Sequence, residues 1–141
     1  MALKANRLKI GDTYREQIVE DLKRTQIIQY AGASGDYNPV HSDEVFAVKV
    51  AGFPSIFAHG MLTMGMTGKM LTNYVGDGRL TYYGVRFTSQ VWPGDDLEAM
   101  ATVEAIREED QGKRYVDLRV ETFNQKGVLV LSGSASALID P

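Results

Sequence analysis

The chain has 141 residues, 44% of them hydrophobic and 23% charged, with a formal net charge of −3. This length can bury one hydrophobic core, and the charge balance argues against a surface that binds polyanions. The absence of cysteine excludes disulfides, thiolate metal sites and cysteine nucleophiles. No apolar run approaches the roughly 18 residues of a membrane-spanning helix, and the N-terminal residues lack the apolar segment of a signal peptide. We therefore expect one cytoplasmic domain over residues 1–141.

The first part of the chain is expected to hold three short elements. Residues 14–21 have the composition of an edge strand. Apolar residues at helical spacing predict a helix from about residue 24 to Gly32, because glycine is a natural terminator. Ser42 or Asp43 can then cap a short helix that ends at Val50.

Residues 60–75 are predicted to form the longest helix. They are apolar almost all round, which is typical of a helix buried on every side. Gly65 and Gly68 inside this helix each cost about 1 kcal/mol relative to alanine. Close packing of the helix backbone is the preferred explanation for them, and a loose, functional helix is the alternative.

The rest of the chain is predicted to be strand. Residues 97–108 alternate, with one apolar face from Leu97 to Ala105, and turn residues separate this run from its neighbours. The four expected strands cover residues 81–92, 97–108, 115–123 and 128–139. Long antiparallel strands after one buried helix predict an α+β fold in which the sheet wraps around that central helix.

The segment from Tyr30 to His41 carries the candidate chemistry. Asn38-Pro39 forces a bend, so that Asp36 and His41 lie on either side of one rigid turn. A carboxylate and an imidazole held in this way suit acid–base catalysis, although an aspartate in Ser-Gly-Asp is also common turn chemistry.

A second candidate segment is Ala58-His59-Gly60-Met61-Leu62, where a glycine opens the long helix. His59 is interpreted as a capping or packing residue. Asp36, His41 and His59 are also conceivable metal ligands, but their spacing is not typical of a closed site, so no metal is expected.

These residues resemble a known family, the MaoC-like hydratases and dehydratases of the hot-dog fold, which include the (R)-specific enoyl-CoA hydratases. Within it the chain most resembles the catalytic subunits of mycobacterial-type (3R)-hydroxyacyl-ACP dehydratases. The resemblance covers nearly the whole chain and includes Val85-Arg86-Phe87 followed by Pro93-Gly94-Asp95. The residues that match the family's hydratase motif are Tyr30, Ser34, Gly35, Asp36, Asn38, Pro39, Val40 and His41.

The resemblance implies syn addition or elimination of water at the C2–C3 bond of an acyl thioester, without a cofactor. Asp36 and His41 would act on the water and on the C2 proton, and the N–H of Gly60 would bind the oxyanion. A backbone N–H at a helix N-terminus is a preorganised donor for enolate charge. Some members carry a serine in the central helix where this chain has Gly68, so the contact made by that serine is expected to be absent or replaced.

Four further residues are assigned to substrate binding by the same resemblance: Tyr30, Asn38, Met61 and Arg86. Met61 is expected to line the core or a tunnel. Arg86 is either a solvated charge on a strand or a contact to the phosphate of the carrier, which is CoA or an acyl carrier protein.

Two other functions are compatible with a hot-dog fold. A thioesterase would normally place its carboxylate on the central helix, but residues 60–75 contain no Asp or Glu. A non-catalytic partner subunit would not need both Asp36 and His41. A lone protomer would expose a sheet edge, so we expect a dimer, either with itself or with a related hot-dog chain.

Overall fold

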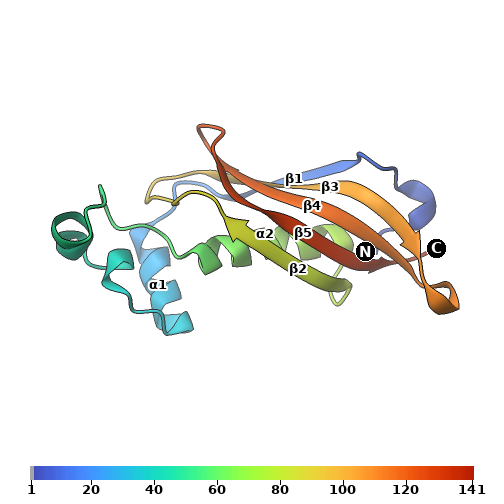
Figure 1. Cartoon of the computed structure of the whole chain (residues 1–141), viewed down its shortest axis with the longest axis horizontal. Coiled ribbons are helices and arrows are strands. Elements are labelled where there is room, and N and C mark those ends of the chain that lie inside the picture. The colour runs from blue at the N-terminus through green and yellow to red at the C-terminus, as the bar shows by residue number, and fades with distance from the viewer. Residues whose placement is uncertain (1) are drawn as a thin grey trace.

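The computed structural model describes residues 2–141 as one antiparallel sheet with a long helix on one face (Figure 1). The strand order across the sheet is β1-β3-β4-β5-β2. Residues of β3, β4 and β5 follow one another as a meander, whereas β2 lies beyond β5 at one edge and β1 beyond β3 at the other. The strands are β1 Thr13–Val19, β2 Leu80–Phe87, β3 Leu97–Glu108, β4 Arg114–Asn124 and β5 Leu129–Ile139.

The helix α2, Gly60–Val75, has the predicted bounds but is not buried all round. The sheet covers one side of it, where Leu62, Thr67 and Leu71 are buried. On the opposite side Met61 is 55% exposed, and Gly65 is also exposed. The prediction of a helix buried on every side is therefore wrong for the protomer, because only one face has a sheet against it.

The glycines of α2 differ in their surroundings. A Cβ built on Gly68 would lie 3.2 Å from the ring of Tyr83, so a close approach explains this glycine. A Cβ on Gly65 would meet nothing within 4 Å. The explanation by close packing is therefore confirmed at Gly68 and wrong at Gly65.

The buried face of β3 follows the predicted alternation only as far as Val103. The pairing of β3 with β4 shifts register between Val103 and Ala105. Beyond this irregularity Ile106, rather than Ala105, packs against the core. A bulge of this kind moves the following side chains to the other face, which simple alternation does not anticipate.

The strand β2 ends at Phe87 rather than at Trp92. The N–H of Thr88 still donates to the carbonyl of Val130 at 3.0 Å. Beyond Thr88 the backbone leaves the sheet, and the carbonyl of Val91 accepts a hydrogen bond from the N–H of Ala58 at 2.8 Å. The chain beyond β2 is thus tied to the segment that precedes α2, and the two lie together over one end of the sheet.

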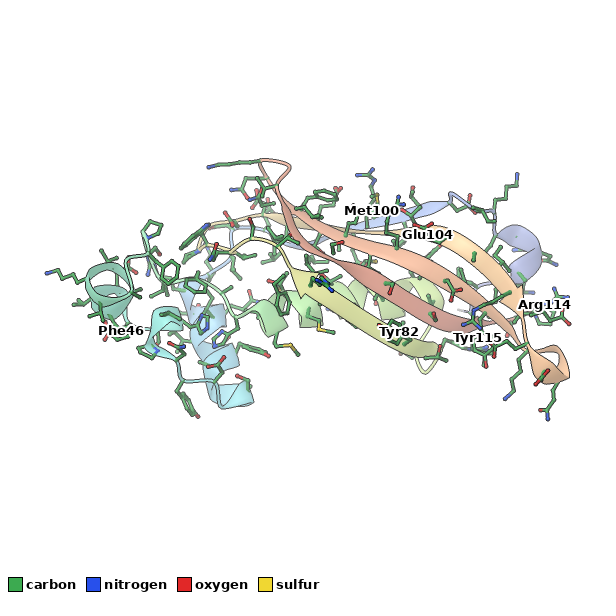
Figure 2. All side chains as sticks on the ribbon, viewed as in Figure 1. Phe46, Tyr82, Met100, Glu104, Arg114 and Tyr115 are labelled. Atoms are coloured by element: carbon green, nitrogen blue, oxygen red, sulfur yellow. The ribbon has the colours of Figure 1, made fainter. Side chains whose placement is uncertain are left out.

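The helix α1, Arg24–Ser34, and the turns after it project beyond that end of the sheet (Figure 1). Phe46 marks this projecting part, at the opposite end of the molecule from Arg114 and Tyr115 (Figure 2). The predicted terminator Gly32 is wrong: α1 ends at Ser34, and Gly35 follows it as the C-cap in the left-handed conformation, with φ 76°.

The helical segment Phe46–Val50 follows the turn. The carboxylate of Asp43 accepts a hydrogen bond from the N–H of Phe46 at 3.1 Å, which confirms Asp43 as the cap. Among residues 2–141, no helix is both long enough and apolar enough to cross a bilayer.

Candidate active site

The turn after α1 is held by its own side chains. One carboxylate oxygen of Asp36 accepts a hydrogen bond from the N–H of Asn38 at 3.2 Å. The side-chain oxygen of Asn38 in turn accepts from the N–H of Val40 at 3.2 Å. Pro39 adds stiffness, because proline fixes its own φ. Together with the two hydrogen bonds it makes the turn from Asp36 to His41 rigid. Asp36 therefore does take part in turn chemistry, through one of its two oxygens.

His41 lies at the end of this turn and is 8% exposed. Its Nδ1 is 2.6 Å from the carbonyl oxygen of Phe57. A carbonyl can only accept, so Nδ1 carries the proton, and Nε2 is left as an acceptor. Burial lowers the pKa of His41, the Phe57 hydrogen bond opposes this, His59 lowers it further and Asp36 raises it. The net lowering leaves a neutral imidazole whose free nitrogen can take a proton.

His59 joins this turn to the start of α2. The side chain is 2% exposed, and its Nε2 donates to the backbone carbonyl of Asp36 at 3.0 Å. Its ring stacks on that of His41, with centroids 3.9 Å apart and planes at 25°. Tyr30 of α1 meets the ring of His59 edge-on, at 4.8 Å between centroids. His59 occupies the N-cap position without a capping hydrogen bond, so it packs rather than caps.

Asp36, His41 and His59 offer ligand atoms within 4.8 Å of one another. The stacking of the two imidazoles nevertheless makes them a poor metal site. Lone pairs of imidazole nitrogens lie in the ring planes, and two stacked planes only 25° from parallel do not converge on one point close to both rings. A zinc or similar ion needs ligands that converge at about 2.0–2.1 Å.

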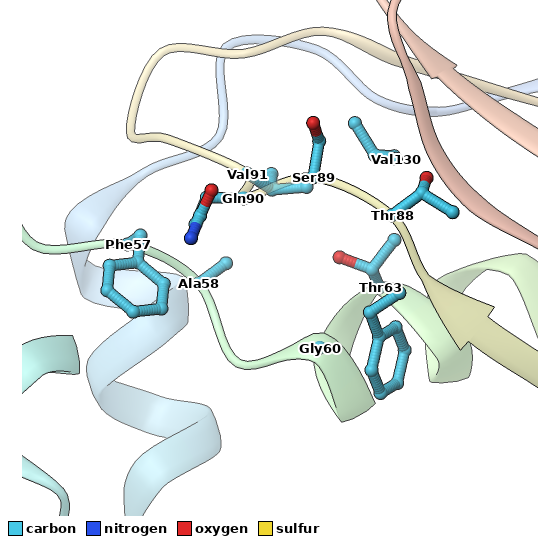
Figure 3. A pocket seen from close by; sticks show the side chains of 10 residues that line it. Phe57, Ala58, Gly60, Thr63, Thr88, Ser89, Gln90, Val91 and Val130 are labelled. Carbon is cyan, nitrogen blue, oxygen red and sulfur yellow. The ribbon is translucent and has the colours of Figure 1, made fainter.

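Gly60 is the first residue of α2 and lies beside a cavity of about 320 Å³ (Figure 3). The N–H of Gly60 has no acceptor among residues 2–141. A Cβ on Gly60 would lie 2.7–2.9 Å from ring atoms of Phe87, so the ring occupies the space a side chain would need. The other residues that line the cavity are Phe57, Ala58, Thr63, Thr88, Ser89, Gln90, Val91 and Val130.

The cavity and the histidine pair share one wall. Asp36, His41 and His59 do not line the cavity. Phe57, however, borders the cavity and also binds His41 through its carbonyl. The hydroxyl oxygen of Thr63 points toward the cavity and is buried without a hydrogen-bond partner (Figure 3).

The structure brings some of the residues predicted for the site together and leaves others apart. Asp36, His41 and Tyr30 come together around His59. Asn38 holds the turn, and Met61 is exposed next to Gly60.

Arg86 lies apart from this group of residues. The neighbouring Tyr83 and Phe87 point toward α2, since the hydroxyl of Tyr83 donates to the carbonyl of Met64 at 2.7 Å and Phe87 packs on Gly60. Strand alternation then turns Arg86 to the outer face of the sheet. The structure does not bring Arg86 to the site.

Sequence reasoning missed two features of this region: the contacts of His59 with both Asp36 and His41, and the buried hydroxyl of Thr63. Nothing local to His59 indicates a partner in the turn before it, because that contact depends on how α1 packs against α2. The sequence feature that could have indicated a role for His59 is its place directly before Gly60, the glycine that opens α2.

Comparison with known proteins places these features in context. The family model of the MaoC-like domain matches residues 5–125. A mitochondrial 3-hydroxyacyl-[acyl-carrier-protein] dehydratase of Arabidopsis thaliana is 32% identical over 136 residues, which cover 94% of this chain and 78% of that protein. An (R)-specific enoyl-CoA hydratase of Aeromonas caviae is 29% identical over 135 residues, or 94% of this chain and 96% of that protein.

Some relatives are much longer than this chain. A Mycobacterium tuberculosis 3-hydroxyacyl-thioester dehydratase is 43% identical over 70 residues, which are only 24% of that protein. Among solved structures, an unliganded R-hydratase of Pseudomonas aeruginosa superposes with a TM-score of 0.82 and 26% identity, covering 99% of this chain and 86% of that one. This likeness confirms the predicted hot-dog fold.

Proposed function

Because this chain belongs to the MaoC-like domain family, we propose that it is a hydro-lyase that adds water reversibly to trans-2-enoyl thioesters. The reverse reaction is dehydration of (3R)-hydroxyacyl thioesters, and the carrier is CoA or an acyl carrier protein. The observation that carries the proposal is the approach of Asp36 to a neutral His41 whose Nε2 is free to accept a proton.

The proposed chemistry needs an acid–base pair and an oxyanion donor. In the hydration direction, water bonds to C3 and gives up a proton to the Asp36–His41 pair. The electron pair of the double bond moves toward C2 and the thioester carbonyl, and C2 then takes a proton from the same pair. A histidine with a pKa near or below neutrality suits both transfers.

Gly60 is the proposed oxyanion donor. Its N–H lies at the N-terminus of a helix, where the dipole favours negative charge, and it has no acceptor among residues 2–141. Such a donor contributes about 3–4 kcal/mol to the stabilisation of a developing enolate. The cavity beside Gly60 offers room for part of the acyl group.

Of the four residues expected to bind substrate, three are kept in the proposed site. Tyr30, which packs on His59, and Met61, which is exposed beside Gly60, are proposed to contact the substrate. Asn38 acts by holding the turn. Arg86 is left out, because its side chain points away from α2. The single domain over residues 1–141, the cytoplasmic location and the dimer stay predictions.

The thioesterase is the second candidate, since it also needs an oxyanion donor. A thioesterase would normally place its carboxylate on the central helix, but α2 contains no Asp or Glu. A non-catalytic partner subunit finds no support in a turn that keeps both Asp36 and His41 beside each other.

The test is an assay of the purified chain with crotonyl-CoA and a longer enoyl-CoA, following the absorbance of the conjugated thioester. We expect hydration by the native chain and a loss of about 10²–10⁴-fold in Asp36→Asn, the usual contribution of a general acid–base group. Asp77→Asn, which changes an exposed aspartate after α2, is the matched control and should keep full activity.

The other outcomes of this assay separate the candidates. Release of free thiol without a hydroxyacyl product would identify a thioesterase. Equal activity of Asp36→Asn and the native chain would contradict the assigned carboxylate. An inactive native chain would contradict a hydro-lyase acting alone on CoA thioesters.

A further inference from the structure

We propose that His59 is a positioning residue that holds both members of the proposed catalytic pair, Asp36 through its backbone and His41 through the face of its ring. The inference rests on the proposed function, because it concerns the residues assigned there to proton transfer. His59 itself is placed behind the pair and does not act on the substrate.

The contact with Asp36 fixes the beginning of the turn. The Nε2–H of His59 donates to the Asp36 carbonyl at 3.0 Å, from a side chain that is almost fully buried. The hydrogen bonds within the turn fix its shape, but they do not join it to α2. Hydrogen bonds that join Val40 and His41 to Phe57 tie the end of the turn to the segment before α2. The His59 contact ties its beginning, so the distance from Asp36 to the helix N-terminus depends on His59.

The contact with His41 fixes the end of the turn. The two rings overlap at 3.9 Å, while the Nδ1 of His41 is bound to Phe57. The hydrogen bond to Phe57 at one edge and the stacked ring of His59 on one face together hold the His41 ring in a single orientation. That orientation decides where the free Nε2 points, which sets the geometry of proton transfer.

The hydrogen bonds also assign opposite tautomers to the two imidazoles. His41 carries its proton on Nδ1 and His59 carries its proton on Nε2, because each of these nitrogens faces a carbonyl oxygen. The Nδ1 of His59 is buried without a partner.

The ionisable groups that face these rings are few among the described residues. Asp36 approaches from the turn, His59 from the start of α2, and Tyr30 of α1 contacts the ring of His59 edge-on. His59 lowers the pKa of His41, in addition to the larger effect of burial. Replacement of His59 by a group that cannot ionise should therefore raise the pKa of His41.

Two substitutions separate the hydrogen bond from the stacking. His59→Phe keeps a flat ring but has no donor for the Asp36 carbonyl, whereas His59→Gln keeps an amide donor and loses the ring. We expect kcat to fall about tenfold in His59→Phe, the effect on a rate of one lost hydrogen bond, with KM nearly unchanged. His59→Gln should recover part of this loss.

The pH dependence of kcat/KM is a second test, because a general loss of stability does not shift its acid limb. In both His59 variants the acid limb of kcat/KM should shift to higher pH, because the pKa of His41 rises. Thr67→Val is the control: it breaks the buried hydrogen bond from α2 to Thr122, and it should lower stability while leaving the limb in place.

A measurement on histidine itself decides the proposal without activity. The chain contains 2 histidines, so nitrogen-15 labelling of histidine gives two rings to assign, and His59→Gln leaves only His41. We expect opposite tautomers in the native chain and a higher pKa of His41 in His59→Gln. The same tautomer for both rings, or an unchanged pKa together with unchanged kcat in both variants, would overturn the proposal.

This design also separates two failures. A native chain without hydratase activity but with the expected tautomers and pKa change would refute the proposed reaction and keep the role of His59. If the native chain is active but neither its kinetics nor the pKa of His41 changes when His59 is replaced, the proposed reaction stands and the role of His59 is refuted. If His59→Phe does not fold, the native chain and His59→Gln still give the tautomers and the pKa.

Discussion

The imidazole of His41 combines burial with one unpaired nitrogen. Burial lowers its pKa by disfavouring the charged form, and the Phe57 carbonyl only partly opposes this. The same environment that prepares a base therefore also makes its protonation unfavourable to the folded state. Activity and stability should depend on pH through one group.

The stability consequence has a definite sign. The unfolded chain has a histidine pKa near the ordinary 6.5, and the folded pKa of His41 lies below it. As pH falls below that value the unfolded state binds the proton first, so the free energy of unfolding should decrease until the folded pKa is passed. Urea unfolding at several pH values between neutrality and mild acid measures this change.

His41→Gln provides the comparison for this titration. The variant has no imidazole at this position, so the part of the pH dependence that comes from His41 should disappear while that of the carboxylates remains. Identical pH dependence in the two chains would show that the environment of His41 does not favour its neutral form.

At the scale of single residues, the sequence predicted the turn and both members of the proposed pair, because Asn38-Pro39 and its neighbours specify a local structure. The role of His59 was not predictable. Its partners lie in the turn after α1, far from His59 in the sequence, and local sequence does not encode such a contact. The placement of Arg86 on the outer face was not predictable for a related reason, since only the strand register tells which face it occupies.

The helix α2 offers a matched pair of glycines. At Gly60 a Cβ would press on the ring of Phe87 at 2.7–2.9 Å, whereas at Gly65 it would meet nothing within 4 Å. We expect Gly60→Ala to lower the free energy of unfolding by about 1–3 kcal/mol through overpacking. Gly65→Ala should raise it by about 0.5–1 kcal/mol, because alanine is the better helix former.

Chemical denaturation of both variants beside the native chain checks this prediction. The two substitutions are identical in chemistry and lie in the same helix, so their difference isolates the contact with Phe87. Equal effects at the two positions would mean that the ring moves aside without cost.

Among the elements, the strands of the meander and the bounds of α2 were predictable because long periodic patterns and turn residues define them. The departures are local. The β3 irregularity after Val103 moves Ile106 inward, β2 ends early and the chain beyond it pairs Val91 with Ala58, and Gly35 rather than Gly32 takes the left-handed conformation. The first two departures depend on a partner elsewhere in the chain. The third depends on which of two nearby glycines ends the helix.

The two edges of the sheet differ in character, which bears on the expected dimer. The exposed side chains of β1 are polar, and Arg15 pairs with Glu98 at 2.9 Å. On β2, by contrast, Tyr82 is 57% exposed and Phe87 49% exposed. Charged side chains protect an edge from pairing, and exposed aromatic residues do not.

We therefore expect a dimer that uses the β2 edge. Sedimentation equilibrium should give about twice the chain mass of 15.6 kDa. Tyr82→Glu should shift the distribution toward the monomer, because it replaces an exposed aromatic side chain of this edge with a charge. Gln17→Glu on β1 is the control and should leave the dimer intact; a monomeric native chain, or dissociation caused by Gln17→Glu, would contradict the assignment.

The projecting segment has its own small interior. Ala31, Ala47 and Ile56 are buried there, yet they are not part of the main apolar cluster beneath the sheet. A region with few apolar contacts opens at a lower free energy than the strands of a large core. Asp36 and His41 both belong to this less stable unit. Warming should therefore inactivate the protein by local unfolding of the turn that carries the proposed catalytic pair, at temperatures where the sheet and α2 remain folded. Cooling should then restore activity without the whole chain having to refold.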